Sequence, residues 1–242
     1  MIETESLIQL LVNASFILAF MAMAGGSIFF FMMRDSVVPR YRSAMIVSGV
    51  ILFIAALNYY YMKGWYLEAV NQGLDSVPTA YRYIDWLLTT PLMLIKFPLL
   101  LGLGGRGVSF MIKLIVLDII MIVAGFFGEL FIADQALHFG LFGLGALCWV
   151  AILYLLLTAT SSLPERFPEV VRKSIRVMVM FVLIGWSIYP LGYVLPSFGL
   201  PIDIRELVYN IGDIINKVGL AVVVYIGAAA MTKQEMEFES QA

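Results

Sequence analysis

The chain alternates long apolar runs with short polar segments. A membrane-spanning helix needs roughly 20 mostly apolar residues, and seven stretches meet this requirement, at about 7–33, 43–65, 80–103, 111–132, 139–160, 171–195 and 203–230. The one longer connection is expected at 64–80, because its Gly, Asp, Ser and Pro are typical of a loop. Since no linker or shift in composition interrupts this pattern, it predicts an all-α fold: one seven-transmembrane-helix bundle over residues 1–242.

Composition and charge agree with a membrane protein. The chain is 62% hydrophobic and 13% charged, whereas soluble domains are about 45–50% apolar and 25% charged. The net charge of −2 argues against a nucleic-acid partner. Basic residues set orientation by favouring the cytoplasmic loops, so we expect the N-terminus outside, the C-terminus in the cytoplasm, and a multi-pass protein of a prokaryotic plasma membrane. These basic residues lie in the first, third and fifth loops: Arg34, Arg40, Arg42, Arg106, Lys113, Arg166, Arg172, Lys173 and Arg176.

The third span, RYIDWLLTTPLMLIKFPLLL, carries charges that a membrane helix normally avoids. Each costs about 2.5–3.5 kcal/mol near the centre of a span. At about 100° per residue, Asp85, Thr89 and Lys96 fall within roughly 40° of one another, with Arg82 one turn further out and about 60° from Asp85. Asp85 and Lys96 are about 16 Å apart along the axis and so cannot pair directly.

The seventh span repeats this feature, because Asp213 and Lys217 lie four residues apart on one face. Ionisable groups inside a membrane usually face the bundle interior and mark an ion or proton path. The alternative is a set of purely structural ion pairs, but such pairs often stabilise no more than an apolar replacement does. A lysine in a dry pocket readily forms a Schiff base with a carbonyl compound. Asp213 or Asp85 could then be its counter-ion.

Four sequence motifs resemble those of the microbial rhodopsins. They are RYIDWLLTTPL in the third span, GWSIYPLGY at 185–193, DIINKVG at 213–219, and VSGV with YYYMKG in the second span, which is similar to proteorhodopsin. The resemblance covers essentially the whole chain. It implies all-trans retinal bound to Lys217, Asp85 and Asp213 as counter-ions, Asp85 as the proton acceptor with Thr89 bonded to it, and Arg82 as a switch facing outward.

The resemblance also implies a chromophore pocket. In it Asp118 would bond Thr90, an apolar Met93 would favour green absorption, and Phe142 would close the window that a carotenoid antenna needs, so no antenna is expected. Neighbouring Gly140, Gly143 and Gly145 would allow close helix packing. The pocket residues that the resemblance implies are Asn58, Trp86, Thr90, Met93, Asp118, Met121, Gly125, Phe142, Trp149, Trp186, Tyr189, Pro190 and Tyr193.

The triplet Asp85, Thr89 and Lys96 resembles the lysine-donor branch of outward proton pumps. This implies a light-driven ion transporter rather than an enzyme, with Lys96 relaying protons from the cytoplasm to the Schiff base. Burial disfavours a charged amine, so Lys96 would be held neutral and would load when the cytoplasmic side hydrates. The alternative is that Lys96 merely reaches the membrane interface.

The pattern departs from its relatives at Asn58, where proteorhodopsins usually have a histidine against the acceptor aspartate; His138, near a helix end, cannot replace it. Glu206, with Glu129 behind it, is the candidate for proton release, although a solvated loop-end carboxylate is slightly favoured for either. The rival function is a sensory rhodopsin that signals through a separate membrane transducer. We expect no metal site, and the resemblance implies a trimer or pentamer.

Overall fold

The computed structural model describes residues 6–73, 79–101, 105–161, 163, 167–199 and 201–241, and no strand occurs among them. The first five long helices are α1 (Leu7–Met33), α2 (Pro39–Asn71), α3 (Ala80–Leu101), α4 (Gly105–Leu130) and α5 (Gln135–Thr160), with a 3₁₀ turn η1 (Arg34–Ser36) between α1 and α2. The sixth long helix consists of three consecutive segments: α6 (Glu169–Met180), the π-helical turn η2 (Phe181–Gly185) and α7 (Ile188–Val194). The 3₁₀ turn η3 (Leu195–Phe198) follows it. The seventh long helix joins α8 (Ile202–Ile214), the π-helical turn η4 (Ile215–Gly219) and α9 (Leu220–Gln241).

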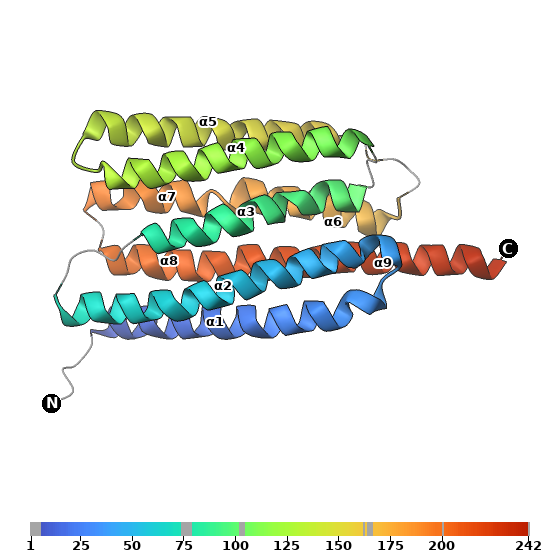
Figure 1. Ribbon diagram of the computed structural model, residues 1–242, viewed down its shortest axis with the longest axis horizontal. Coiled ribbons are helices and arrows are strands. Elements are labelled where there is room, and N and C mark those ends of the chain that lie inside the picture. The colour runs from blue at the N-terminus through green and yellow to red at the C-terminus, as the bar shows by residue number, and fades with distance from the viewer. Residues whose placement is uncertain are drawn as a thin grey trace.

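Seven of the described helical segments are long and apolar enough to cross a membrane, as the sequence predicts. They lie side by side in one bundle (Figure 1). Large apolar side chains such as Leu7, Ile28 and Leu147 are exposed on its outside, which suits contact with lipid. The chain is therefore a multi-pass membrane protein.

Two predicted boundaries were wrong. The segment 64–80 was expected to be a loop, but α2 continues to Asn71 because the run GWYLEAVN holds no proline and only one glycine. The helix ends where Gly73 adopts a φ of 64°, the left-handed conformation that favours glycine just after a helix. The tail after residue 230 is also helical, to Gln241, since Lys, Gln, Glu and Met are good helix formers. Residues 74–78, and Arg166 among the counted basic residues, lie outside the described residues.

The central position of α3 explains how this helix can carry charges. Consecutive helices α1 to α4 pack in turn, α5 packs against α4 and α6, and α8 and α9 close the bundle against α1 and α6. In the apolar window of α3, 61% of the residues are buried, against 22% for α4. The polar residues of α3 therefore face protein rather than lipid.

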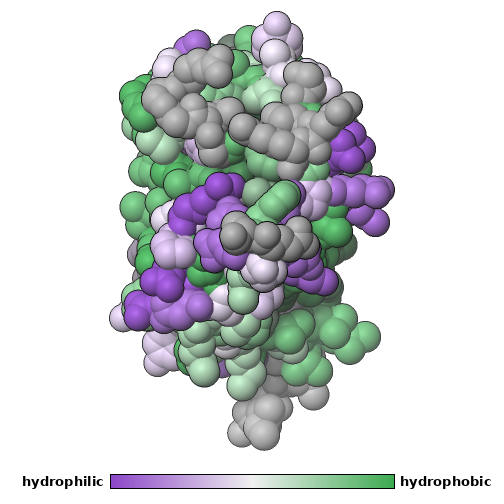
Figure 2. Space-filling model, turned by 90° about the vertical axis from the view of Figure 1, so that its right-hand side faces the viewer, coloured by the Kyte–Doolittle hydropathy of each residue, from purple (hydrophilic) through white to green (hydrophobic). Residues whose placement is uncertain are grey.

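The end of the bundle from which α9 projects carries exposed polar residues. Figure 2 views the end from which α9 projects, and hydrophilic side chains gather across the middle of that face with apolar side chains around it. At this end Asp35 pairs with Arg34 at 3.3 Å and with Arg42 at 3.6 Å, and all three side chains are exposed. Ion pairs this exposed contribute little to stability, but they suit an aqueous boundary.

The two π-helical turns face each other in the middle of the bundle. The Asn216 side-chain nitrogen donates to the Gly185 carbonyl at 2.9 Å, so η4 is bonded to η2. A Cβ atom at position 185 would collide with the Asn216 side chain, which explains why glycine stands there. A π-helical turn changes the helical register locally, so the residues around Lys217 depart from the α-helical spacing used for the sequence.

Candidate functional site

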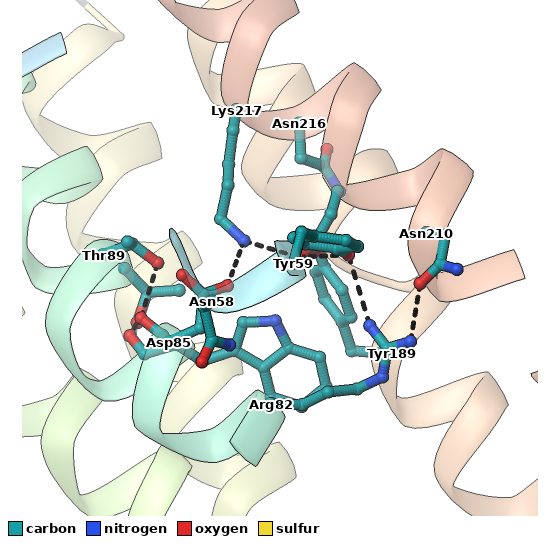
Figure 3. Close-up of polar contacts among 12 residues, drawn as sticks. Asn58, Tyr59, Arg82, Asp85, Thr89, Tyr189, Asn210, Asn216 and Lys217 are labelled. Carbon is teal, nitrogen blue, oxygen red and sulfur yellow. Dashed lines mark hydrogen bonds and ion pairs between the residues drawn. The ribbon is translucent and has the colours of Figure 1, made fainter. Parts of the chain in front are cut away.

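The centre of the site is the amine of Lys217, which is 1% exposed and lies between two carboxylates. Its Nζ donates to Asp213 Oδ2 at 2.5 Å and to Asp85 Oδ2 at 2.6 Å. Asp213 lies one turn earlier on the same helical rod, whereas Asp85 reaches the amine from α3 (Figure 3). Two buried carboxylates thus face one amine, as the spacing of charges in the two spans suggested.

The two carboxylates differ in their hydrogen bonds. Asp213 accepts from the Tyr59 hydroxyl at 2.9 Å and from the Tyr189 hydroxyl at 2.5 Å in addition to Lys217. Among the described residues, the Asp85 carboxylate accepts only from Lys217, and its Oδ1 has no hydrogen-bond partner. In the part of the chain that the structure describes, the Asp213 carboxylate thus accepts three hydrogen bonds, whereas one oxygen of the Asp85 carboxylate accepts none.

Thr89 does not bond to the Asp85 carboxylate, contrary to the expectation from the sequence. Its hydroxyl donates to the Asp85 main-chain carbonyl at 2.8 Å. A threonine inside a helix commonly bonds the carbonyl four residues earlier, and this local bond takes its only proton. Thr89 therefore lies one turn from Asp85 on α3 without a hydrogen bond to its carboxylate.

Asn58, which stands where proteorhodopsins usually have a histidine, makes no hydrogen bond to Asp85 among the described residues. Its amide donates to the Tyr81 carbonyl at 2.9 Å. Tyr59 reaches the site instead, because one residue turns a helix by about 100°. Tyr59 was not predicted from the sequence, although a buried tyrosine in the middle of a span needs a partner for its hydroxyl group.

Arg82 and Glu206 form a buried ion pair on one side of Lys217. Glu206 is 1% exposed, and its Oε2 accepts from Arg82 Nε at 3.0 Å and Nη2 at 2.5 Å, while Oε1 accepts from Arg205 at 3.2 Å. The interpretation of Glu206 as a solvated loop-end carboxylate is therefore wrong. Glu129 is apart from this pair and accepts from the Tyr83 hydroxyl at 3.1 Å.

Hydrogen bonds connect this ion pair to the centre of the site. Arg82 donates to the Tyr59 hydroxyl at 3.2 Å and to Asn210 Oδ1 at 2.6 Å, and Tyr59 in turn donates to Asp213. The Asn210 amide is fixed by a 2.9 Å bond to Ser15 of α1. A continuous polar path thus runs from Lys217 to Glu206 (Figure 3 shows its inner part). Asn210 and Arg205 were not found from the sequence.

Lys96 lies toward the other end of α3 from Arg82. Its side chain is 0% exposed, and its Nζ has no hydrogen-bond partner among the residues that the structure describes. An amine that reached the membrane interface would be exposed, so the alternative reading of Lys96 does not fit. From the helical rise, Lys96 lies about 16 Å along the axis from Asp85.

An apolar cavity lies next to the carboxylates, because Tyr189, which lines the cavity, also bonds Asp213. Every pocket residue expected from the sequence lines it except Asn58, Met93 and Asp118. Asp118 lies behind the wall and accepts from the Thr90 hydroxyl at 2.7 Å, as expected. The lining residues are Tyr83, Trp86, Thr90, Met121, Ile122, Gly125, Phe142, Gly145, Ala146, Trp149, Trp186, Tyr189, Pro190, Tyr193 and Tyr209.

The glycines of α5 only partly follow the expectation of close packing. A Cβ atom at Gly140 or Gly143 would meet nothing within 4 Å, whereas one at Gly145 would lie 3.4 Å from the Met121 carbonyl. Only Gly145 allows α5 to approach α4 closely, and it does so at the cavity wall.

The fold and site together define a class of membrane protein: seven helices around a buried lysine, with paired carboxylates on one side and an aromatic cavity on the other. Residues 10–231 match the family model described as bacteriorhodopsin-like protein, and the chain belongs to that family. The family implies a retinal chromophore. The cavity fits an apolar polyene because aromatic and aliphatic side chains line it.

Individual relatives agree with this assignment. The crystal structure of Exiguobacterium sibiricum rhodopsin is 37% identical and superposes with a TM-score of 0.86, covering 95% of this chain and 100% of that one. Green-light absorbing proteorhodopsin of Gamma-proteobacterium EBAC31A08 is 32% identical over 219 residues, 88% of this chain and 84% of the relative. The structure of xanthorhodopsin, described as a light-driven ion pump with dual chromophore, is 29% identical with a TM-score of 0.86, covering 94% of this chain and 96% of that one.

Proposed function

We propose that this protein is a light-driven outward proton pump of the lysine-donor kind. Its family and its likeness to a structure described as a light-driven ion pump support the transport of ions. The observation that carries the proposal is the arrangement around Lys217. Asp85 lies against its amine with one carboxylate oxygen that has no partner among the described residues, and Lys96, buried and likewise without a partner among them, lies further along α3, the helix that carries Asp85. That is an acceptor and a relay on one path.

All-trans retinal, bound as a Schiff base to Lys217, would supply the light-driven change that makes the lysine nitrogen give up its proton. Asp85 would receive this proton, because its Oδ2 already contacts the nitrogen at 2.6 Å. Asp213 would remain ionised, since the two tyrosine hydroxyls that bond it stabilise the anion. Because Asp213 has more hydrogen-bond donors than Asp85, Asp85 would be the carboxylate that accepts the proton.

On the outward side, Arg82 would carry the effect of that transfer to Glu206. Lys217, Asp85 and Asp213 form an inner cluster of charges. While Asp85 is ionised, the Arg82 guanidinium is shared between this inner cluster, which it reaches through Tyr59, and Glu206. Protonation of Asp85 removes one negative charge from the inner cluster, so the attraction of Arg82 toward Glu206 strengthens by comparison. Glu206, bonded to two arginines, would be an ionised carboxylate at rest and would have no proton of its own to release. It would hold Arg82 while Asp85 is protonated, and the proton released outward would be the one that Asp85 later gives up.

On the other side, Lys96 would return a proton to the Lys217 nitrogen. A buried ammonium without a hydrogen-bond acceptor is costly, so Lys96 would be stored neutral and would take up a proton when water enters its end of the bundle. Each proton moved outward works against about 2.3 kcal/mol per 100 mV of membrane potential. The basic loops orient this uptake end toward the cytoplasm and the N-terminus outward. Assembly as a trimer or pentamer remains a prediction from the family resemblance.

The test follows external pH under light in cells that express the protein with added retinal. The expected result is acidification that a protonophore abolishes, and that is absent for Lys217→Ala expressed to the same level. Alkalinisation would reverse the direction of transport. A coloured protein that leaves the pH unchanged would exclude pumping and favour the sensory alternative with a separate transducer.

A further inference from the structure

His138, the one histidine of the chain, is buried in a place that the proton path does not use. It lies in the first turn of α5 and is 2% exposed. Its ring packs between α4 and α7: Nδ1 is 2.8 Å from the Gly128 carbonyl, and the ring plane stacks on Tyr193 at 4.6 Å between centroids and 16° between planes. These contacts are too specific for a residue that only fills space.

The contacts fix which ring nitrogen of His138 carries a proton. A carbonyl oxygen only accepts, so the bond to Gly128 needs a hydrogen on Nδ1. The Tyr193 hydroxyl, 3.0 Å from the same nitrogen, then donates to the His138 main-chain carbonyl at 3.2 Å. Nε2 has no partner among the described residues, which fits a nitrogen that carries no hydrogen, because a buried donor without an acceptor is costly.

The same contacts immobilise Tyr193. Its ring also stacks on Phe142, one turn after His138 on α5, at 5.0 Å and 27°. A Cβ atom at position 128 would collide with the Tyr193 hydroxyl, so glycine there is what allows the tyrosine to reach α4. Tyr193 is therefore fixed by groups from both α4 and α5.

The immobilised ring forms the wall of the cavity that is remote from Lys217. Tyr189 both bonds Asp213 and lines the cavity, which marks the end near the lysine. Tyr193 lies one turn further along α7 and stacks on Phe142 of α5. Helix α5 packs against α4 and α6 rather than against α8, η4 and α9, the segments of the helix that carries Lys217. A ligand attached to the lysine would thus point its free end at this wall.

We propose that His138 is a specificity-determining positioning residue: by holding Tyr193 against Phe142 and Gly128, it limits the length and ring size of the aldehyde that Lys217 can bind. The proposal rests on the proposed function, because it takes Lys217 as the point of attachment. It also states how the aldehyde is selected. The hydrogen bond from His138 Nδ1–H and the stacking of Tyr193 on His138 and Phe142 set the length of the cavity.

The first experiment needs no aldehyde. Protein labelled with ¹⁵N only in histidine gives the signals of His138 alone, since the chain has no other histidine. The expected ¹⁵N spectrum of the protein without retinal shows a protonated Nδ1 and an unprotonated Nε2. A proton on Nε2 with a bare Nδ1 would overturn the proposal, because the bond to Gly128 could not form.

The second experiment compares the yield of pigment from retinal with that from an analogue aldehyde carrying a larger, naphthyl ring. One or two extra carbons in a tight apolar pocket change discrimination by about tenfold or more. We expect the wild type to prefer retinal, and His138→Ala to reduce that preference about tenfold. Gly128→Ala, which displaces Tyr193 without altering His138, should act in the same direction. Leu147→Ala, on the same helix with its side chain 69% exposed, should leave the preference unchanged.

The outcomes separate this proposal from the proposed function. If retinal colours the wild type but His138→Ala and Gly128→Ala both keep the full preference, the positioning role of His138 is refuted while attachment to Lys217 stands. If retinal does not colour the wild type at all, the proposed function fails, and the positioning role fails with it even where the histidine spectrum agrees.

Discussion

The substitution Glu206→Gln tests the main difference between the structure and the expectation from the sequence. In the structure Glu206 is 1% exposed and pairs with both Arg82 and Arg205. Glutamine has nearly the same shape but no negative charge, so the change leaves two buried guanidinium groups without their anion. A solvated carboxylate at a loop end would lose almost nothing by the same substitution.

The expected cost follows from these contacts. Removing one partner of a buried ion pair costs about 3–5 kcal/mol, because a buried charge is left uncompensated. For Arg82 the cost lies in the lower half of this range, because it keeps its hydrogen bonds to Asn210 and Tyr59. Arg205 keeps no other ion-pair partner among the described residues. At about 2 °C per kcal/mol for a chain of this size, the midpoint of thermal unfolding should fall by about 6–10 °C.

Tryptophan fluorescence during heating in detergent measures this shift without relying on a chromophore. The matched control is Glu237→Gln on α9, where the carboxylate is 62% exposed and lies 3.9 Å from an exposed Lys233; a pair of this kind contributes about 0.3–0.5 kcal/mol. The double variant with Arg205→Met should recover part of the loss, since it removes one of the unpaired charges. A fall below about 2 °C for Glu206→Gln would refute the buried ion pair.

Three further substitutions test the remaining parts of the site. Asp85→Asn should abolish light-driven acidification, because an amide cannot accept the proton of Lys217; persistent acidification would exclude Asp85 as acceptor. Lys96→Met should slow the return of the proton to Lys217, measured by flash spectroscopy, by about 10²-fold or more. The wild-type rate of this step should fall as pH rises, because Lys96 takes its proton from bulk water. Equal kinetics in both proteins would exclude Lys96 as the proton relay. Thr90→Val should lower the free energy of unfolding by about 1–3 kcal/mol, because it leaves buried Asp118 without its hydrogen-bond donor; no loss in chemical denaturation would contradict that bond.

The sequence by itself determined the features that lie within one helix or depend on composition. Seven apolar runs of membrane length predicted the seven spans, because a bilayer fixes the length of an apolar helix. The spacing of Asp213 and Lys217 predicted that they share a face, and the structure places their atoms 2.5 Å apart. Helix extents were predicted less well, since residues such as those of 64–71 form a helix as readily as a loop.

Only the tertiary structure decided what lies opposite each face. Whether Asn58 or Tyr59 turns toward the site depends on how α2 rotates against α3, and one residue of difference replaces an amide by a phenol. Glu206 could be read as solvated until the packing of α8 against the bundle buried it beside Arg82. The helical period fixes angles within a helix, whereas the rotation between helices is set by the side chains that pack between them, and no pattern in a single segment contains that information.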